Sequence, residues 1–440
     1  MRIGFARVDI TPTEPVPLDG YGNGDKRISE NILSPLSATA VAVTDAEGVT
    51  ALLIQMDSLL LPARFAAELR ERISAATDVP VEHIILHANH LHTTPQLYAT
   101  HHDSILRYNE MAKERVTACS VQAMEDRKLV TSAEMAKTRT KGLNFVRHYV
   151  LEDGSYKGDN FGELNPSPYA GHTTEADPEM RLVKFHRLGG KDVLLVNWQT
   201  HPHRTGGSLK KDVSADILGV LRDSLEEQLG CCAVYFNGAS GNINPTSRIP
   251  EENITKTYVE QGQALAACAV AAEKAYEPLA LGQVKVCTRK VWEPLNRPDP
   301  AILEVCMKIR DFWRETNDSI ASKKLSNSYG INSQYAAMQF ISRINMKEEG
   351  FDFPFTVLSV GDMAFAAVPY EMFDTNAQYV RQQSPFAMTV VASCCNTYLN
   401  YVPSAYGYIH GCYETDTTRA RPGAGERFAS ELVKMLQSIR

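Results

Sequence analysis

Strand-like and helix-like stretches alternate along most of the chain, as judged from the spacing of its apolar residues. Short β-branched or apolar runs predict strands, and apolar residues at four-residue intervals, such as Phe65, Leu69 and Ile73, predict helices. The predicted strands cover 40–44, 49–56, 83–87, 192–200, 231–236, 356–360, 364–368 and 388–392, and the predicted helices cover 60–77, 108–125, 213–229, 256–276 and 425–439. This alternation predicts an α/β fold with a mixed β-sheet core flanked by helices.

Two segments stand out from this alternation. The first residues, MRIGFARVDITP, contain no long apolar run after Arg2 and predict an edge strand rather than a signal peptide. Residues 298–347 are more polar and predict mostly helices, which would suit an insertion or a lid. We therefore expect a single domain over residues 1–440, with a helical insertion or lid at 298–347.

The composition is that of an ordinary globular protein. Of the 440 residues, 44% are hydrophobic and 22% are charged, and the net charge of −7 gives no sign of nucleic-acid binding. No stretch approaches the roughly 18 apolar residues of a membrane helix, so we expect no stable membrane association. The nine cysteines form no C-x-x-C motif, which predicts reduced thiols in a cytoplasmic protein and disfavours a thiolate metal site.

Histidines gather at the ends of two predicted strands. The sequence HLH, from His90 to His92, follows the strand at 83–87, and HPH, from His201 to His203, follows the strand at 192–200. Two histidines at i and i+2 of an extended segment point the same way, and the proline after His201 keeps that residue out of a helix. Neutral imidazole is a common metal ligand, although either motif alone also fits an ordinary polar loop.

Three further clusters also lie after predicted strands. The Gly- and Asn-rich turn at 237–245 can aim N–H groups at developing negative charge, but its Ser240 lacks the G-x-S-x-G frame of a serine hydrolase. Glu371 ends an apolar stretch, where a lone carboxylate is costly unless it is paired or bound to a metal. Residues 398–414 are rich in aromatic side chains. Each of these clusters, taken alone, also fits a tight turn or ordinary packing.

Taken together and in this order, the clusters resemble the catalytic domain of the neutral/alkaline (non-lysosomal) ceramidase family, a group of zinc-dependent amidases. The resemblance begins with GFA and DITP in residues 4–12 and includes both histidine motifs. It continues through VSAD at 213–216 and the clusters at 238–245, 368–371 and 401–414. It spans nearly the whole chain, and it implies the α/β fold and the zinc cofactor of that domain.

The resemblance also implies a set of metal ligands. His90, His201 and Glu371 match two histidine ligands and a carboxylate ligand of the family, and Tyr401 matches an unusual phenolic ligand. Two neutral imidazoles, a carboxylate and a weak oxygen ligand leave Zn²⁺ room for water, as a catalytic zinc site requires.

Further active-site residues follow from the same resemblance. His92 falls where the family has a catalytic or substrate-binding histidine, and Tyr413 and Arg147 match an active-site tyrosine and arginine. The family's G-D-x-S-P motif is GNINP here, so Asn244 replaces a serine often given a catalytic role. A metal-activated water needs no serine, and Asn244 can donate a hydrogen bond to an oxyanion.

The resemblance and its departures lead to one main prediction. The chain ends at Arg440, so we expect the C-terminal β-sandwich domain of the larger ceramidases to be absent and the substrate to be a small soluble molecule rather than a membrane lipid. The sequence predicts a zinc-dependent hydrolase that cleaves an amide-type (N-acyl) bond with a metal-activated water. Two alternatives stay open: the same site acting on an ester, lactone or glycosidic C–O bond, and a non-catalytic homologue that binds a ligand. A homo-oligomer is compatible with each.

Overall fold

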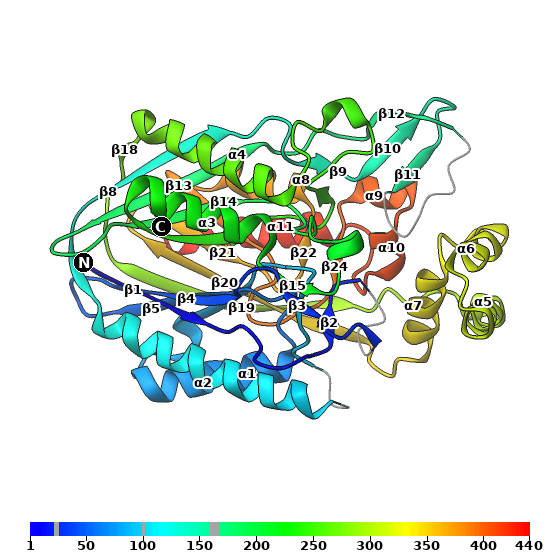
Figure 1. Cartoon of the computed structure of the whole chain (residues 1–440), viewed down its shortest axis with the longest axis horizontal. Helices are drawn as coiled ribbons and strands as arrows, with labels where there is room; N and C mark the ends of the chain where they lie inside the picture. Colours follow the sequence, from blue (N-terminus) through cyan, green and yellow to red (C-terminus); the bar gives the residue numbers. More distant parts are fainter. Residues whose placement is uncertain (22–25, 99–101, 159–166) are drawn as a thin grey trace.

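Two β-sheets form the core of the protein, in a computed structural model that describes residues 1–21, 26–98, 102–158 and 167–440 (Figure 1). Within these residues the larger sheet has nine strands. Eight follow the order β16 (Cys232–Asn237), β14 (Val193–Trp198), β13 (Glu179–Arg187), β8 (Lys128–Arg139), β1 (Arg2–Asp9), β4 (Ser37–Thr44), β5 (Thr50–Met56) and β6 (Ile84–Ala88), and β18 (Glu277–Pro278) pairs with β8. The smaller sheet has the order β19 (Val284–Pro294), β20 (Gly350–Val360), β21 (Met363–Ala367) and β23 (Met388–Ala392).

The two sheets pack face to face, because both have one face of buried apolar side chains. Val41, Leu53 and Phe236 of the larger sheet belong to the same core cluster as Phe365 and Val390 of the smaller sheet. This contact excludes water from both inner faces, and the burial of apolar surface is the main force that holds the layers together.

Helices cover the two outer faces and complete four layers. Helices α1 (Ala63–Thr77), α2 (Asp103–Glu125), α3 (Asp216–Leu229) and α4 (Tyr258–Ala271) pack against the outer face of the larger sheet. Helices α8 (Asp374–Gln383) and α11 (Ala424–Ser438) cover the outer face of the smaller sheet. The predicted mixed α/β core with flanking helices is therefore confirmed, with two packed sheets.

A group of three helices extends away from these layers. Helices α5 (Leu303–Thr316), α6 (Ser319–Ser328) and α7 (Gln334–Asn345) lie at one end of the molecule, in yellow at the right of Figure 1. They hold the helix α10 (Tyr413–Thr417), because Asn332 Nδ2 donates to Asp416 Oδ2 at 2.6 Å and Arg343 donates to the carbonyls of Asp416 and Thr418. The prediction that this segment is mostly helical is confirmed.

Several predicted boundaries shift for identifiable reasons. The first helix begins at Ala63 rather than at residue 60, because Pro62 precedes it in an extended conformation. The prediction that the N-terminal strand is an edge strand is wrong, since β1 pairs with β4 on one side and with β8 on the other. Strands β8, β13 and β19 were not predicted. Much of β8 and β19 is exposed, so their apolar signal is weak.

The strands that precede the predicted polar clusters end in one region. The pairs β5–β6, β14–β16 and β21–β23 are parallel, and loops follow their carboxyl ends. Asn237, at the end of β16, donates its backbone N–H to Nε2 of His87 in β6 at 2.9 Å, so the two outer strands of the larger sheet approach each other there. Within the described ranges, no helix combines the length and the apolar character needed to cross a bilayer.

Short strands and helices build the loops of this region. The strand pairs are β2 (Leu18–Asp19) with β7 (Thr94–Pro95), β3 (Asn31–Ile32) with β15 (Asp212–Val213), β9 (Phe145–Val146) with β17 (Ile243–Asn244), and β22 (Glu371–Met372) with β24 (Tyr401–Val402). Strand β10 (His148–Leu151) lies between β11 (Tyr156–Gly158) and β12 (Tyr169–His172), and helix α9 (Ala405–His410) precedes α10.

Candidate metal centre

His90, His201 and Glu371 meet where strands β6, β14 and β21 end. Oε2 of Glu371 lies 3.1 Å from Nε2 of His90 and 3.1 Å from Nε2 of His201. The three residues are almost fully hidden from solvent, with exposed fractions of 3%, 1% and 1% respectively. They come from loops that are far apart in the sequence, and the two sheets bring them together.

The backbone around both histidines fixes which ring nitrogen faces Glu371. Nδ1 of His90 donates to the carbonyl of Leu59 at 3.0 Å, and Nδ1 of His201 donates to the carbonyl of Ser240 at 2.6 Å. Nε2 is therefore the ring nitrogen of each histidine that faces the carboxylate. Burial, aided by the charge of Arg147, lowers the pKa of His201 to about 3, which keeps this ring neutral.

This arrangement fits a metal ion. Between neutral imidazoles and a carboxylate, a metal ion would remove the repulsion of lone pairs this close together, and among the described atoms Glu371 Oε2 has no hydrogen-bond partner. Ligand atoms bound at 2.0–2.1 Å to a tetrahedral zinc lie roughly 3.3 Å apart, close to the spacing observed here. The two histidines and the glutamate could therefore hold Zn²⁺ with little movement.

Neighbouring groups hold Glu371 in place. The hydroxyl of Tyr398 donates to Oε1 of Glu371 at 2.6 Å, which leaves Oε2 for the histidines. Strands β22 and β24 run parallel with Glu371 opposite Tyr401, so both predicted oxygen ligands stand side by side on one short ladder. Gly241 permits a close approach on the other side, because a Cβ at this position would lie 2.8 Å from the carbonyl oxygen of Glu371.

His90 and His92 converge for a different reason from the one predicted. The segment is not extended: His90 has a φ of 65°, in the left-handed region, and residues 92 and 93 form a turn. The rings of His90 and His92 still lie 5.2 Å apart, and His92 lies 5.6 Å from His201. A non-glycine residue in the left-handed region is uncommon and is often found at functional sites.

The ring of His92 faces the other histidines without a fixed partner. It is half-buried, and neither ring nitrogen has a hydrogen-bond partner among the described atoms. Ligand atoms of His90, His92 and His201 lie within 4.8 Å of one another. Burial, together with the neighbouring histidines, holds the pKa of His92 well below its usual value, so the ring is neutral and can accept a proton or a hydrogen bond.

Arg147 links the histidines to the aromatic segment. Its Nη1 lies 3.2 Å from Nε2 of His201, and its Nη2 donates to the hydroxyl of Tyr401 at 3.3 Å and to the carbonyl of Gly241 at 2.8 Å. A metal held by His201 would bind Nε2, the same ring nitrogen that Nη1 of Arg147 approaches. The guanidinium thus brings a permanent positive charge to the edge of the centre.

Glu414 contacts both Arg147 and His148. Oε1 of Glu414 accepts from Nε of Arg147 at 2.6 Å, and Oε2 lies 3.0 Å from Nε2 of His148. Glu414 is fully buried, and the charges of Arg147 and His148 outweigh the effect of burial and hold its pKa well below the usual range. The carboxylate is therefore ionised and fixes the guanidinium.

His148, Cys412 and Glu414 form a second group whose ligand atoms lie within 4.8 Å of one another. This group fits an ion-pair network better than a metal site. Oε1 of Glu414 already pairs with Arg147, and its Oε2 lies 3.0 Å from Nε2 of His148, so both carboxylate oxygens have partners. Burial raises the pKa of the Cys412 thiol well above its usual value, so the sulfur stays protonated.

The remaining predicted residues lie around the same centre. The ring of Tyr413 contacts that of Tyr401 edge-on, with centroids 5.9 Å apart. Oδ1 of Asn244 lies 3.1 Å from Nε2 of His203, whose ring is 5.6 Å from His92. Ser240 is fully buried, and its carbonyl accepts a hydrogen bond from Nδ1 of His201.

Three residues of the centre had no role assigned from the sequence. Tyr398 and Glu414 lie in the aromatic segment that the sequence singled out, and their positions next to Tyr401 and Tyr413 were the available signal. His148 directly follows Arg147, but no spacing rule distinguishes it from any other polar residue.

The fold resembles that of solved ceramidases. The crystal structure of neutral ceramidase from Pseudomonas aeruginosa matches with a TM-score of 0.73 and 17% sequence identity, over 99% of this chain and 74% of that one. A ceramidase complexed with C2 matches with a TM-score of 0.73 and 16% identity, over 100% of this chain and 75% of that one. The protein thus has a ceramidase-like fold. No protein-family model matches the sequence. The comparison with curated proteins gives no match either.

Proposed function

We propose that this protein is a zinc-dependent hydrolase that cleaves an amide-type bond of a small molecule. The observation that carries this proposal is the position of Glu371 Oε2, 3.1 Å from Nε2 of both His90 and His201, with no donor among the described atoms. Two histidines and a glutamate are a familiar ligand set of catalytic zinc, and Tyr401 is the proposed fourth ligand.

Zinc held by these residues would supply a Lewis acid for the scissile carbonyl and would lower the pKa of water to about 7. An amide-type bond is proposed because the two solved structures compared above, which have a similar fold, are ceramidases. The fold alone does not define the reaction, so the chemistry rests on the site.

Side chains around the centre are proposed to stabilise the developing negative charge. Arg147 is held by Glu414 and points its Nη groups at Tyr401 and His201, where an oxyanion would form. Asn244, whose Oδ1 lies 3.1 Å from Nε2 of His203, is proposed to contribute to the same stabilisation. These groups are fixed before the substrate binds, and preorganised donors are the strongest source of such stabilisation.

His92 is proposed to handle the proton of the leaving group. Its neutral ring is half-buried beside His90 and His201, and both of its nitrogens lack a partner among the described atoms. A ring nitrogen of His92 can therefore hydrogen-bond the substrate or deliver a proton to the amine. Tyr413, whose ring contacts Tyr401, is proposed to assist at the same place.

Metal analysis of the purified protein tests the proposal. We expect about one equivalent of zinc in the parent protein and a large loss in His90→Ala and His201→Ala. His186→Ala is the matched control, because the ring nitrogens of His186 lie 3.2 Å from Glu134 and 2.8 Å from Asp192, outside the centre, and this variant should keep its zinc. Less than about half an equivalent in the parent, unchanged in His90→Ala, would overturn the proposal.

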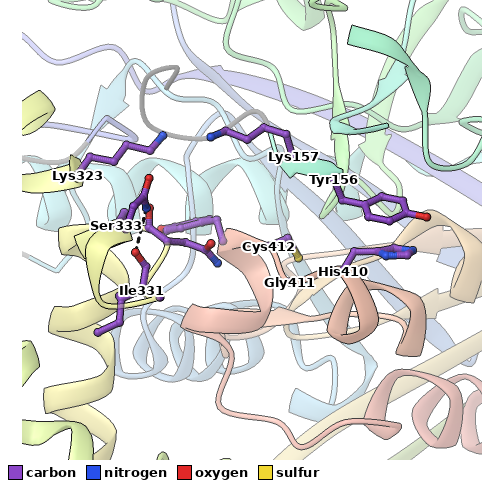
Figure 2. Close-up of a pocket in the computed structure, with 13 residues that line it drawn as sticks. Tyr156, Lys157, Lys323, Ile331, Ser333, His410, Gly411 and Cys412 are labelled. Carbon is purple, nitrogen blue, oxygen red and sulfur yellow. Dashed lines mark hydrogen bonds between the residues drawn. The ribbon is translucent and has the colours of Figure 1, made fainter. Parts of the chain in front are cut away.

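The same centre acting on a C–O bond is the second candidate. It is favoured by the cavity beside Tyr413, where only Ile331 among the described lining residues is aliphatic (Figure 2). A screen of N-acyl compounds, esters and glycosides with the zinc-loaded protein decides between the two. Loss of activity in Ser240→Ala with zinc retained would favour a serine nucleophile instead.

A further inference from the structure

The side chain of Asn237, the last residue of β16, joins the loops that carry His90 and His201. Its Nδ2 donates to the carbonyl of Asn89 at 3.1 Å and to the carbonyl of Thr200 at 2.9 Å, and its Oδ1 accepts from the backbone N–H of Thr200 at 3.2 Å. Asn89 and Thr200 directly precede the two histidines in the sequence. One amide group therefore holds both of the peptide bonds that lead into the proposed histidine ligands.

The neighbours of Asn237 allow its amide group only one orientation. A backbone carbonyl can only accept a hydrogen bond and a backbone N–H can only donate one, so Nδ2 must face the two carbonyls and Oδ1 must face the N–H of Thr200. The hydroxyls of Tyr235 and Ser240 also approach, at 3.1 Å from Oδ1 and 3.4 Å from Nδ2, but Oδ1 keeps the N–H of Thr200 as a donor without Tyr235. Asn237 is 1% exposed, so bulk water does not compete for these hydrogen bonds.

The backbone of Asn237 is fixed by two other strands. Its N–H donates to Nε2 of His87 in β6 at 2.9 Å, and its carbonyl accepts from the N–H of Ser393, directly after β23, at 3.3 Å. Nδ1 of His87 donates in turn to the carbonyl of Ser393 at 2.9 Å, so the three residues are bound to one another. The side chain of Asn237 thus extends from a point that is held on both sides, and it can set the position of the loops that it contacts.

The position of these loops matters because the proposed ligand atoms are closely spaced. Nε2 of His90 and Nε2 of His201 each lie 3.1 Å from Oε2 of Glu371, and a functional site tolerates errors of only about 0.5 Å. His90 also has a φ of 65°, and a non-glycine residue keeps this conformation only where its surroundings determine it. The hydrogen bond from Asn237 to the carbonyl of Asn89 fixes the peptide bond just before this residue.

We propose that Asn237 is a positioning residue of the metal centre, which sets the distance between the imidazoles of His90 and His201 and thereby the affinity for the metal. The assignment rests on the proposed zinc centre and goes beyond its ligand set. Among the described atoms Asn237 makes no hydrogen bond to a proposed ligand side chain, and it acts through the backbone of the two loops.

Asn237→Ala and Asn197→Ala are a matched pair of variants that test this role. Asn197 is 0% exposed, and its Nδ2 also donates to two backbone carbonyls, those of Phe236 at 2.8 Å and Val391 at 3.0 Å, neither of which directly precedes a ligand. Both variants lose buried hydrogen bonds, so both should unfold at lower denaturant concentrations than the parent. In competition with a chelator, the zinc affinity should fall about tenfold or more in Asn237→Ala and stay close to that of the parent in Asn197→Ala.

Cobalt measures the arrangement of the ligands separately from stability. The visible absorption bands of bound Co²⁺ depend on the geometry of its ligands, and a loss of stability alone does not change them in the folded protein. We expect the bands to shift or weaken in Asn237→Ala and to match those of the parent in Asn197→Ala. Equal zinc affinities and equal cobalt spectra in the two variants would overturn the assignment.

The hydroxyls of Thr93 and Thr205 lie 3.0 Å apart and still join the two loops in Asn237→Ala, so we expect this variant to fold. If it does not, Asn237→Ser replaces it. A serine hydroxyl has one proton and can hold only one of the two carbonyls, so the zinc affinity should still fall, and a parental affinity would contradict the assignment.

Failure of this assignment can be told apart from failure of the proposed function. If the zinc-loaded protein cleaves no amide, a loss of zinc affinity confined to Asn237→Ala still supports the positioning role. If the parent binds no metal, crystal structures of both variants decide: Nε2 of His90 or His201 should move away from Oε2 of Glu371 in Asn237→Ala alone, and unchanged distances would overturn the role.

Discussion

Arg147 and Glu414 form an ion pair that is closed off from solvent, although 267 positions separate them in the sequence. Both Nε and Nη2 of Arg147 contact Oε1 of Glu414, at 2.6 Å and 2.5 Å. The pair holds the guanidinium against Tyr401 and His201, so the charge at the edge of the candidate centre depends on a residue from the last quarter of the chain.

Replacement of Glu414 by glutamine should destabilise the protein strongly. The variant leaves a buried guanidinium without its counter-charge, which costs about 3–5 kcal/mol when a buried pair is broken. Chemical denaturation measures the difference in unfolding free energy. Glu14→Gln is the control, because Glu14 pairs with Arg107 at the surface and its loss should have no measurable effect. Equal stabilities of Glu414→Gln and the control would show that the pair does not matter.

The contrast between Arg147 and His90 shows what the sequence can reveal. Local motifs singled out His90 and His201, since histidines directly after strands are visible in any short window, and the family resemblance then gave them their predicted role as ligands. The partner of Arg147 was not predictable in this way, because a contact across 267 positions leaves no periodic pattern. The fold class was predicted because buried strands and amphipathic helices repeat. The half-exposed strands β8 and β19 were missed because their faces are mixed.

Tyr398→Phe should weaken zinc binding without removing it. The hydroxyl of Tyr398 donates to Oε1 of Glu371 at 2.6 Å and so orients the carboxylate. Loss of such a supporting hydrogen bond typically costs about 10–100-fold in metal affinity. Competition with a chelator of known affinity measures the change.

Tyr235→Phe is the control for this change. Tyr235 is more deeply buried than Tyr398, and its hydroxyl donates to the carbonyl of Trp198 at 2.8 Å, so this variant should lose some stability and keep the parental zinc affinity. The interpretation of Tyr398 fails if both variants bind zinc as the parent does.

Asp416 should make stability depend on pH between about 4 and 8. Burial raises its pKa to about 6, above the value of about 3.9 in an unfolded chain. The folded protein therefore binds this proton more tightly, and the contribution of Asp416 is greatest below about pH 4 and is lost as the pH rises through 6. When the pH rises from 4 to 8, the free energy of unfolding of Asp416→Asn should increase by about 2 kcal/mol relative to that of the parent.

Denaturation curves of parent and variant at pH 4 and pH 8 measure this gain. Asp223→Asn is the comparison, since Asp223 is 74% exposed and the effect of its replacement should be the same at both pH values. If the difference in unfolding free energy between Asp416→Asn and the parent were the same at pH 4 and pH 8, the pKa of Asp416 would be the same in the folded and the unfolded protein.

Gly241→Ala should disturb the candidate centre more than its single added methyl group suggests. The new Cβ would lie 2.8 Å from the carbonyl oxygen of Glu371 and 2.9 Å from that of Met372. Both are backbone atoms that cannot rotate away, so the loop that carries Ser240 must move from β22. Because the Ser240 carbonyl orients His201, this movement should reduce zinc affinity as well as stability, the latter by about 1–3 kcal/mol.

Gly171→Ala is the matched control for this substitution. Nothing lies within 4 Å of a Cβ at Gly171, and its φ is not positive, so alanine fits there without strain. We expect this variant to bind zinc and unfold as the parent does. If Gly241→Ala also kept the parental zinc affinity, the close approach of residue 241 to Glu371 would not be needed to position His201 relative to Glu371.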